Sequence, residues 1–377
     1  MLICRLLLGI SEAAFGPGIP FYLSFFFKRN ELAYRVGLFI SAAPLASTFA
    51  SSLAYGITSL SDKLPIQGWR LLFILEGVPS LVVAVWAWLW IPDSPSSARW
   101  LNGRERKIAT LRLRKEHQSN LPPENIQKSS TRAPKCRRPF LDLSEIRKTL
   151  LDPKGYLTAL MFFSANIAFS SMPVFAPIII HSIGYSSFAA QGLSALPNLF
   201  AFVIVLLIST LSDRFQIRSL PIVGVALMAM TGYILLALAT PLHMSNTLRY
   251  LCLFPITAGF FSAVTLIIVW TLDNQASDEG KGTGVAMLNI IGQIGPLVGT
   301  GLYPEHEAPG YVRGHAVCAI FMGVVAVLAL GLRVVLGREN RRTEQRGRYA
   351  MVGGMDGEVT GTAAADDGAG GEFVFML

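Results

Sequence analysis

Charged residues are scarce in this chain. Asp, Glu, Lys and Arg make up 15% of its 377 residues, whereas a soluble domain has about 25%. Three long segments contain no charged residue at all, namely 36–58, 188–212 and 220–241. Each matches the ~20 residues that an α-helix needs to cross a ~30 Å hydrocarbon layer. The shortage of charge therefore excludes a soluble globular protein and predicts an all-α polytopic membrane protein.

Cysteine and histidine are also sparse, which limits the chemistry that the chain can perform. The residues are Cys4, Cys136, Cys252 and Cys318, with His117, His181, His243, His306 and His315. The cysteines show no metal-site or disulfide spacing, and the histidines form no cluster of the kind that a membrane-embedded enzyme would need. We therefore expect a protein that is not an enzyme and that has no metal and no cofactor.

The apolar segments divide the chain into two groups. We expect nine transmembrane helices, at about 1–27, 36–58, 70–91, 155–180, 188–211, 219–240, 248–272, 283–303 and 314–336. This pattern predicts an incomplete N-terminal helical half (1–92), a cytoplasmic central loop (93–152), a six-helix C-terminal half (153–337) and a disordered cytoplasmic tail (338–377). Apolar residues at helical spacing among the arginines of 97–117 predict an amphipathic helix on the membrane surface within the loop.

Lys and Arg are distributed unevenly among the connections between these helices. The central loop and the tail are strongly basic, whereas 181–187 and 241–247 contain no Lys or Arg. The positive-inside rule then predicts that the loop and the C-terminus are cytoplasmic and that Met1 is outside. The connection 272–283 is an acidic exception on the inner side. Because the net charge of +8 follows from this topology, the basic loop does not indicate a nucleic-acid partner.

Two charged residues interrupt the first apolar run. Arg5 and Glu12 are seven residues apart, so two helical turns bring them onto nearly one face, about 10 Å apart along the axis. Each would cost about 2.5–3.5 kcal/mol at the centre of a bilayer, which favours positions facing a protein interior or a wet cavity. The alternative is a structural ion pair, with the Arg5 side chain reaching the outer membrane surface.

Polar residues in other spans leave two interpretations open. Asn289 and Gln293 are four residues apart and therefore share a helix face. The same segment contains glycines that permit close helix contact, namely Gly292, Gly295 and Gly299. Hydrogen bonding between helices is one interpretation for this pair and for Asn166, and lining of a substrate cavity is the other. Tyr22 either lines the same cavity or anchors its helix at the membrane interface.

Five stretches of the sequence carry a resemblance to a known family. They are RLLLGISEAAFGPGIPFYLSFFFKRNE (5–31), GWRLLFILEGVPS (68–80), IPDSPSSARWLNGRER (91–106), LSDRFQIR (211–218) and NIIGQIGPLVGTGLYPEHEAPGY (289–311). In this order they resemble the major facilitator superfamily, and more narrowly its anion:cation symporter group, which contains fungal allantoate and nicotinate permeases. The resemblance implies an MFS-type bundle of twelve helices. The first span here matches the fourth of that family, so the first three are expected to be absent.

The resemblance also implies roles for the residues in the first spans. In related organic-anion transporters the matching pair binds the substrate carboxylate and carries the proton, which makes Arg5 a substrate-binding residue and Glu12 the proton-coupling residue. A guanidinium binds a carboxylate through two hydrogen bonds, and a buried glutamate can titrate as its surroundings change. Asn289 and Gln293 are further candidates for substrate binding. Glu76 stands in the family pattern W-R-x-x-F-x-x-E-G and is expected to have a structural or gating role.

A second group of residues is expected to act at the inner gate. Asp213, Arg214 and Arg218 resemble the cytoplasmic D-R motif, whose charge contacts hold that gate closed in the superfamily. A solvated loop of mixed charge is the alternative. Asp93 begins a stretch that resembles the family's cytoplasmic helix, where Asp93 or Ser94 is expected to cap the helix and Asp93 to pair with an arginine.

The chain also departs from the family pattern W-x-x-x-N-x-x-G-x-x-K-R. Trp270 and Asn274 fit, whereas the later positions hold Ser277, Gly280 and Lys281, with acidic residues between them. The last six residues, EFVFML, weakly resemble the aromatic-rich end of family members.

These observations predict a secondary active transporter. We expect proton-coupled symport of a small organic anion by alternating access, with the proton as the coupling ion. The alternative is a truncated or degenerate membrane protein of the same family that does not transport. The expected partners are the anion and the lipid bilayer, with no nucleic acid and a monomeric chain, and the expected location is the plasma membrane.

Overall fold

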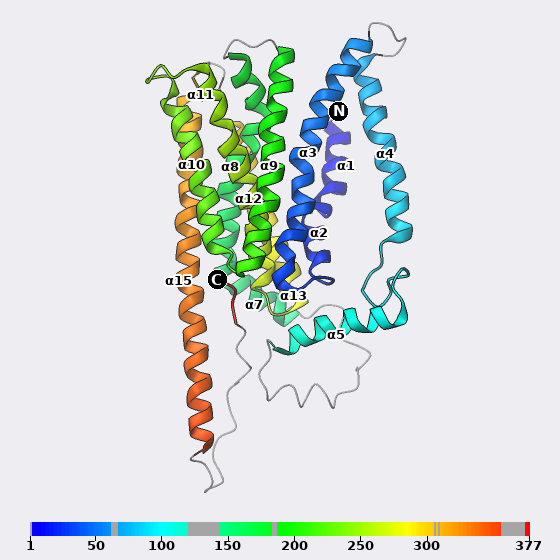
Figure 1. The fold of residues 1–377 in the computed structure, drawn as a ribbon, viewed down its shortest axis with the longest axis vertical. Helices are drawn as coiled ribbons and strands as arrows, with labels where there is room; N and C mark the ends of the chain where they lie inside the picture. Colours follow the sequence, from blue (N-terminus) through cyan, green and yellow to red (C-terminus); the bar gives the residue numbers. More distant parts are fainter. Residues whose placement is uncertain are drawn as a thin grey trace.

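The computed structural model describes residues 2–61, 67–119, 143–182, 187–304, 307, 310–355 and 374–377, and over these residues it contains α-helices and no strand. Figure 1 shows an elongated bundle in which most helices run along one long axis. Within the described residues, eight segments are helical, long and apolar enough to cross a membrane. The predicted all-α polytopic membrane fold is confirmed.

The N-terminal helices are loosely packed at the edge of the bundle. They are α1 (Leu2–Ala13), α2 (Phe15–Leu23), α3 (Arg29–Ser61), α4 (Gly68–Trp90) and α5 (Gly103–Ser119). The described side chains of α1 and α4 are nearly all exposed, and in Figure 1 α4 stands apart from the C-terminal helices. These apolar surfaces are suited to lipid or to other apolar partners, because they cannot be solvated well by water.

The C-terminal helices form a compact group around one central helix. They are α7 (Leu143–Leu151), α8 (Pro153–Ser182), α9 (Ser187–Phe215), α10 (Ser219–Ala239), α11 (Asn246–Leu251), α12 (Leu253–Asp273), α13 (Asp278–Gly292), α14 (Gly295–Thr300) and α15 (Val312–Met355). Every residue of α12 from Ile256 to Asp273 is buried, as expected for a helix that is apolar on all sides. α12 packs against α8, α9, α10 and α3, and α3 also runs along α9. α3 therefore joins the N-terminal helices to the C-terminal group.

Three of the predicted spans are each two consecutive helices. The breaks follow Ala13, Leu251 and Gly292, and each of these residues lies four positions before a proline, namely Pro17, Pro255 and Pro296. A proline has no N–H to donate to the carbonyl four residues earlier, and its ring crowds that carbonyl. The breaks are therefore consequences of the sequence.

Side chains from neighbouring helices satisfy two of the carbonyls that prolines leave free. Asn166 Nδ2 on α8 donates to the carbonyl of Gly292, 3.2 Å away, which Pro296 cannot reach. Tyr250 Oη donates to the carbonyl of Leu193 at 2.9 Å, four residues before Pro197. An unpaired carbonyl is costly in hydrocarbon. These bonds therefore stabilise the main chain next to each proline, and they also join neighbouring helices. The interhelical interpretation of Asn166 is confirmed.

The central loop contains the predicted helix, with a different start. α5 begins at Gly103, where Glu105 Oε2 accepts a hydrogen bond from the Asn102 N–H at 2.8 Å, a capping interaction. The prediction that Asp93 or Ser94 caps this helix is wrong, because Ser94 lies in a separate turn bonded to Ser97. Arg112 forms an ion pair with Glu31 and fixes α5 to the start of α3.

The structure differs from the predicted disordered tail at two places. α15 continues beyond the predicted span to Met355, and the first part of its continuation is rich in arginine and glutamate, which are good helix formers. Val374–Leu377, defined here as the tail segment, lies against the lower end of the bundle in Figure 1. The remaining positions of the predicted tail, 356–373, lie outside the described residues.

Candidate functional site

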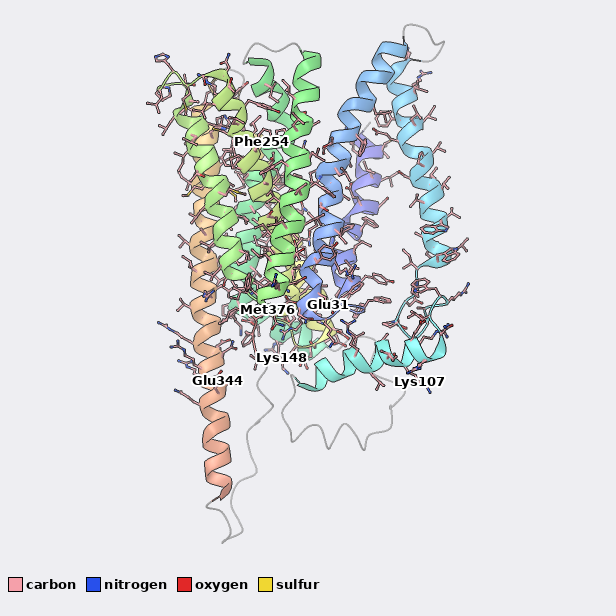
Figure 2. The ribbon with its side chains drawn as sticks, viewed as in Figure 1. Glu31, Lys107, Lys148, Phe254, Glu344 and Met376 are labelled. Carbon is pink, nitrogen blue, oxygen red and sulfur yellow. The ribbon has the colours of Figure 1, made fainter. Side chains whose placement is uncertain are left out.

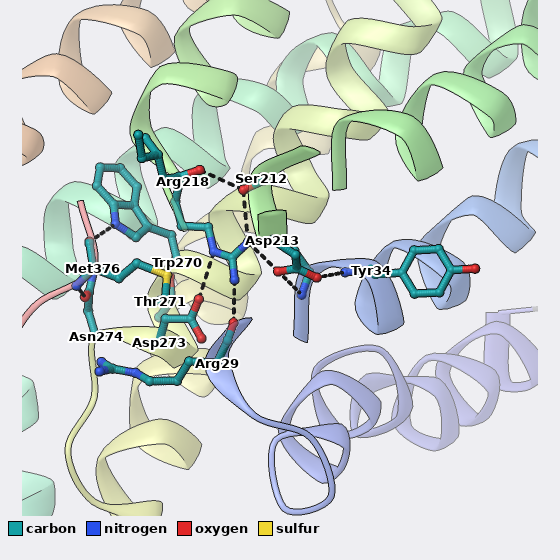
Figure 3. A network of polar contacts seen from close by, with 12 residues as sticks. Arg29, Tyr34, Ser212, Asp213, Arg218, Trp270, Thr271, Asp273, Asn274 and Met376 are labelled. Carbon is teal, nitrogen blue, oxygen red and sulfur yellow. Dashed lines mark hydrogen bonds and ion pairs between the residues drawn. The ribbon is translucent and has the colours of Figure 1, made fainter. Parts of the chain in front are cut away.

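Arg218, between α9 and α10, is the centre of a buried polar network at one end of the bundle (Figure 3). Its side chain is fully buried. Nε donates to Asp273 Oδ2 at 2.9 Å, and Nη1 donates to Asp213 Oδ1 at 2.7 Å. Nη1 also donates to Ser212 Oγ at 2.9 Å, and Nη2 donates to the carbonyl of Arg29 at 2.5 Å. The planar guanidinium thus serves four acceptors with donors held in a fixed geometry, whereas a lysine has only three donors and no fixed plane.

Asp213 connects this network to the N-terminal helices. Its Oδ1 accepts a hydrogen bond from the Ala33 N–H at 3.2 Å, and its Oδ2 accepts one from the Tyr34 N–H at 2.7 Å. Both amides lie in the second turn of α3, so the Asp213 carboxylate binds the main chain of that helix directly. Together with the bond from Arg218 to Arg29, these contacts hold the start of α3 against the corner between α9 and α10. We name the residues Arg29, Ser212, Asp213, Arg218 and Asp273 the Arg218 network.

The charges in this network depend on one another. The side chains of Arg218 and Asp273 are fully buried, and that of Asp213 is nearly so. Burial alone would lower the pKa of Arg218, but the carboxylates of Asp273 and Asp213 more than offset it, and the pKa is raised above its usual value. Arg218 therefore stays charged. Because removing one partner leaves another charge buried without compensation, we expect these contacts to form and break together.

The structure brings together two of the three residues predicted for the D-R motif. Asp213 and Arg218 are in direct contact, whereas Arg214 is exposed, and among the described residues it has no hydrogen bond or ion pair. The alternative of a solvated loop of mixed charge therefore fits Arg214 but not the other two.

Arg5 and Glu12 lie on α1, which is one continuous helix between them. They are therefore two turns apart, as predicted. Both side chains are exposed, and within the described part of the chain neither forms an ion pair or hydrogen bond, with the other or with any third residue. The alternative of a structural ion pair between them is not found here, and their roles in substrate and proton binding stay predictions.

The other predicted substrate residues lie on α13 and at its end. Asn289 Nδ2 donates to the Val285 carbonyl of its own helix at 3.0 Å, and Gln293 is exposed at the C-cap. Neither side chain makes a cross-helix hydrogen bond to a described residue. The glycines do allow the predicted close approach, since a Cβ on Gly295 would lie 2.6 Å from the carbonyl oxygen of Phe163 on α8. Roles for Asn289 and Gln293 in binding stay predictions.

Three predicted residues lie around α4. Glu76 is exposed on this helix and Asp93 is exposed just beyond its end, and neither side chain has an ion-pair partner among the described residues. Tyr22 Oη donates to the carbonyl of Pro92 at 2.7 Å and so ties the end of α2 to the end of α4. Gating roles for Glu76 and Asp93 stay predictions.

Two parts of the site were missed by the sequence interpretation. Asp273 stood out as an acidic residue on an inner connection, and this anomaly was the signal for its place beside Arg218. The tail segment contacts Trp270 and Asn274, and its signal was the weak resemblance of EFVFML to the end of family members. Its contact with Asn340 on α15 had no sequence signal.

Comparisons with known proteins agree on one family. A family model described as Major Facilitator Superfamily matches residues 1–300. The chain is 31% identical over 360 residues to "MFS transporter prlL" of a fungal species (strain NRRL 50135), covering 94% of this chain and 68% of that protein. It is 28% identical over 298 residues to a "Putative tartrate transporter" of Agrobacterium vitis, covering 79% of this chain and 61% of that protein.

One solved structure shares the fold. The proton:xylose symporter XylE, bound to 6-bromo-6-deoxy-D-glucose, superposes with a TM-score of 0.58 at 15% sequence identity, covering 85% of this chain and 66% of that one. At this identity the likeness supports the arrangement of helices, and the substrate of that protein is not transferred.

Proposed function

The chain belongs to the major facilitator superfamily, and from this premise we propose that it is a proton-coupled secondary transporter of a small organic anion. It is an integral membrane protein of a transporter family rather than an enzyme. The proposal adds the mode of action, which is alternating access, the substrate class and the coupling ion. It also includes membership of the anion:cation symporter group, location in the plasma membrane and a cytoplasmic C-terminus.

The observation that carries the proposal is the Arg218 network. It fastens the start of α3, in the N-terminal helices, to α9, α10 and α12 of the C-terminal helices at one end of the bundle. A transporter that alternates between two open states needs a contact of this kind, which is strong when assembled and breaks as a unit. We assign the network as the inner gate, with this end of the bundle facing the cytoplasm, where the basic loop and tail belong by the positive-inside rule.

Arg5 and Glu12 support the substrate class and the coupling ion. They share one face of α1 within a segment that is apolar enough to cross a membrane, so exposure to lipid would be costly for both. A guanidinium at that depth suits a carboxylate substrate, and a glutamate nearby suits a transported proton. The name of the relative from Agrobacterium vitis, a putative tartrate transporter, fits the same class of substrate.

Uptake of a panel of radiolabelled carboxylates into proteoliposomes, measured against external pH, tests this proposal. We expect uptake driven by an inward proton gradient, abolished by Arg5→Ala, and no longer dependent on that gradient in Glu12→Gln. Cys4→Ser is the matched control, since Cys4 is the exposed neighbour of Arg5 on the same helix, and it should transport normally.

Three outcomes would count against the proposal. Normal uptake by Arg5→Ala would exclude Arg5 as the anion site. An unchanged pH profile in Glu12→Gln would exclude Glu12 as the proton carrier. The absence of uptake for every carboxylate by a folded, reconstituted chain would favour the alternative of a family member that does not transport.

A further inference from the structure

The tail segment, Val374–Leu377, is bound through its main chain next to the Arg218 network. Asn340 on α15 accepts a hydrogen bond from the Phe375 N–H and donates to its carbonyl, both at 2.9 Å. Asn274, after α12, does the same for the next residue, accepting from the Met376 N–H at 2.8 Å and donating to its carbonyl at 3.3 Å. Each amide side chain thus bonds to both the N–H and the carbonyl of one residue, as a neighbouring β-strand does when it binds an extended peptide.

Further contacts hold the tail segment against the bundle. Trp270 Nε1 donates to the Met376 carbonyl at 2.8 Å, and the main-chain N–H of Arg218 donates to a main-chain oxygen of Leu377 at 2.7 Å. The side chains of Phe375 and Leu377 pack against the buried core. Figure 3 shows Met376 beside Trp270 and Asn274.

The ammonium group of Lys154 also contacts the tail segment. Lys154 Nζ lies 4.1 Å from the centre of the Phe375 ring, within the range of a cation–π interaction. The same Lys154 Nζ is held by Glu339 Oε2 at 2.8 Å, on the helix that carries Asn340. The groove that holds the tail segment is therefore built from α8, α12, α15 and the corner between α9 and α10, and it recognises both the main chain and the aromatic side chain of its occupant.

The tail segment also touches the opposite side of the gate. Arg29 Nη1 on α3 donates to the carbonyl of Val374 at 3.3 Å, while the main-chain carbonyl of Arg29 accepts from Arg218. Asn274 directly follows Asp273, and Arg218 contributes both its side chain and its main chain. Figure 2 places Met376 and Glu31, near the start of α3, at the same end of the bundle.

We propose that this groove is an intramolecular peptide-binding site whose ligand is the tail segment, and that its occupation stabilises the closed inner gate. The inference rests on the proposed function, in which the Arg218 network is that gate. Because the bound segment contacts α3 on one side and the C-terminal helices on the other, opening the gate breaks its contacts. By linkage, whatever releases the tail segment favours the inward-open state to the same extent.

Distance measurements between spin labels test this inference in the full-length chain. The labels are placed at Asn30 on α3 and Arg341 on α15, which are both exposed, after replacement of the native cysteines by alanine. Deletion of residues 374–377 is expected to lengthen the distance and to raise the ratio of open to closed molecules about tenfold, because the hydrogen bond from Arg29, which joins α3 to the tail segment, is lost. The acetylated peptide Val-Phe-Met-Leu, added in trans, should restore the short distance, whereas the peptide of reversed order should not.

A point variant tests the same inference in a chain of full length, so that misfolding of the deleted chain is not the explanation of a shifted distance. Asn340→Ala removes both hydrogen bonds to Phe375 and should shift the distance in the same direction, whereas Gln345→Ala, an exposed change on the same helix, should not. Asp213→Asn reports on the gate itself. If Asp213→Asn lengthens the distance but the deletion and Asn340→Ala leave it unchanged, the inference about the tail segment is overturned. The assignment of the Arg218 network as the inner gate is then retained. If Asp213→Asn also has no effect, the gate assignment fails, and the inference fails with it.

Discussion

Arg218 shows what a single arginine does at a junction between helices. Its guanidinium bonds to two carboxylates, one hydroxyl and one main-chain carbonyl, which come from three different helices, α3, α9 and α12. A lysine ammonium has three donors and no fixed plane, so it would leave part of this set without a partner. The residue type, and not merely the charge, is therefore required at position 218.

We expect Arg218→Met to lower the free energy of unfolding by about 3–5 kcal/mol, because two buried carboxylates lose their partner. Adding Asp273→Asn should recover part of this loss, since it removes one of the uncompensated charges. Unfolding in detergent, followed by intrinsic fluorescence, measures the single and double variants.

The exposed neighbour provides the control for this cycle. Arg214→Met should change the free energy of unfolding by less than about 0.5 kcal/mol, as is usual for surface positions. If the effects of Arg218→Met and Asp273→Asn simply added, the two residues would not be coupled, and the account of the network given above would be wrong.

At this scale the sequence predicted two of the three charged side chains that meet in the network and missed the third, Asp273, together with the residues that bind main chain. Asp213 and Arg218 were predicted because a short charged motif between two apolar runs has a recognisable pattern. Asn340 lies in a segment interpreted as a tail, and its partners are an N–H and a carbonyl that every residue possesses. A contact to the main chain of a distant segment leaves no mark in local composition, so it required the structure.

Helix breaks are the main departure at the scale of elements. Within the described residues, the apolar helices lie where the sequence predicted membrane spans. Most of their ends differ from the predicted ends by a few residues, because the length of an apolar run is set by the thickness of the bilayer. The prediction treated three broken spans as single helices, although the prolines at positions 17, 255 and 296 specify each break. What the sequence alone did not give is the partner of the freed carbonyl, since Asn166 lies 126 positions from Gly292.

This pairing predicts a rescue. Asn166→Ala should lower the free energy of unfolding by about 1–3 kcal/mol, because the buried Gly292 carbonyl loses its donor. Pro296→Ala restores a main-chain N–H that can donate to the same carbonyl, so the double variant should be more stable than Asn166→Ala alone. Thermal unfolding in detergent checks both. A double variant that is less stable than Asn166→Ala would show that the break itself, and not the unpaired carbonyl, determines stability.

The contact of α14 with α8 makes a second prediction about elements. Gly295→Ala should cost about 1–3 kcal/mol of stability, because its new Cβ would lie 2.6 Å from the Phe163 carbonyl oxygen and 3.2 Å from the Ile167 nitrogen, and main-chain atoms cannot move aside. Gly301→Ala is the matched control, since its Cβ would meet nothing closer than 3.6 Å. Equal stability of the two variants in the same assay would mean that α14 moves away from α8 without cost.

For the whole molecule, the closed junction between α3 and α9 is the feature that a transport cycle must open. One helical turn before Ser212 on α9, Ser209 is 1% exposed and lies so close to Gly37 on α3 that a Cβ on Gly37 would be 2.6 Å from Ser209 Oγ. Ser219 on α10 is also buried, at 0% exposure, but its Oγ accepts a hydrogen bond from Arg333 Nη1 on α15 at 2.9 Å, so it lies inside the C-terminal helices. The two serines therefore separate opening between the groups of helices from loosening within one of them.

Thiol labelling uses this difference. In a chain without native cysteines, Ser209→Cys should react slowly with a membrane-impermeant maleimide added to the Arg218 end, and adding Asp213→Asn should raise the rate about tenfold. The reason is that Asp213→Asn removes a charge that holds Arg218 and the first turns of α3, which shifts the population toward molecules open at this end. Ser219→Cys should stay unreactive in both backgrounds, because the C-terminal helices move as one packed group. Faster labelling at both positions would indicate general destabilisation, and faster labelling at neither would show that the Arg218 network does not hold the gate.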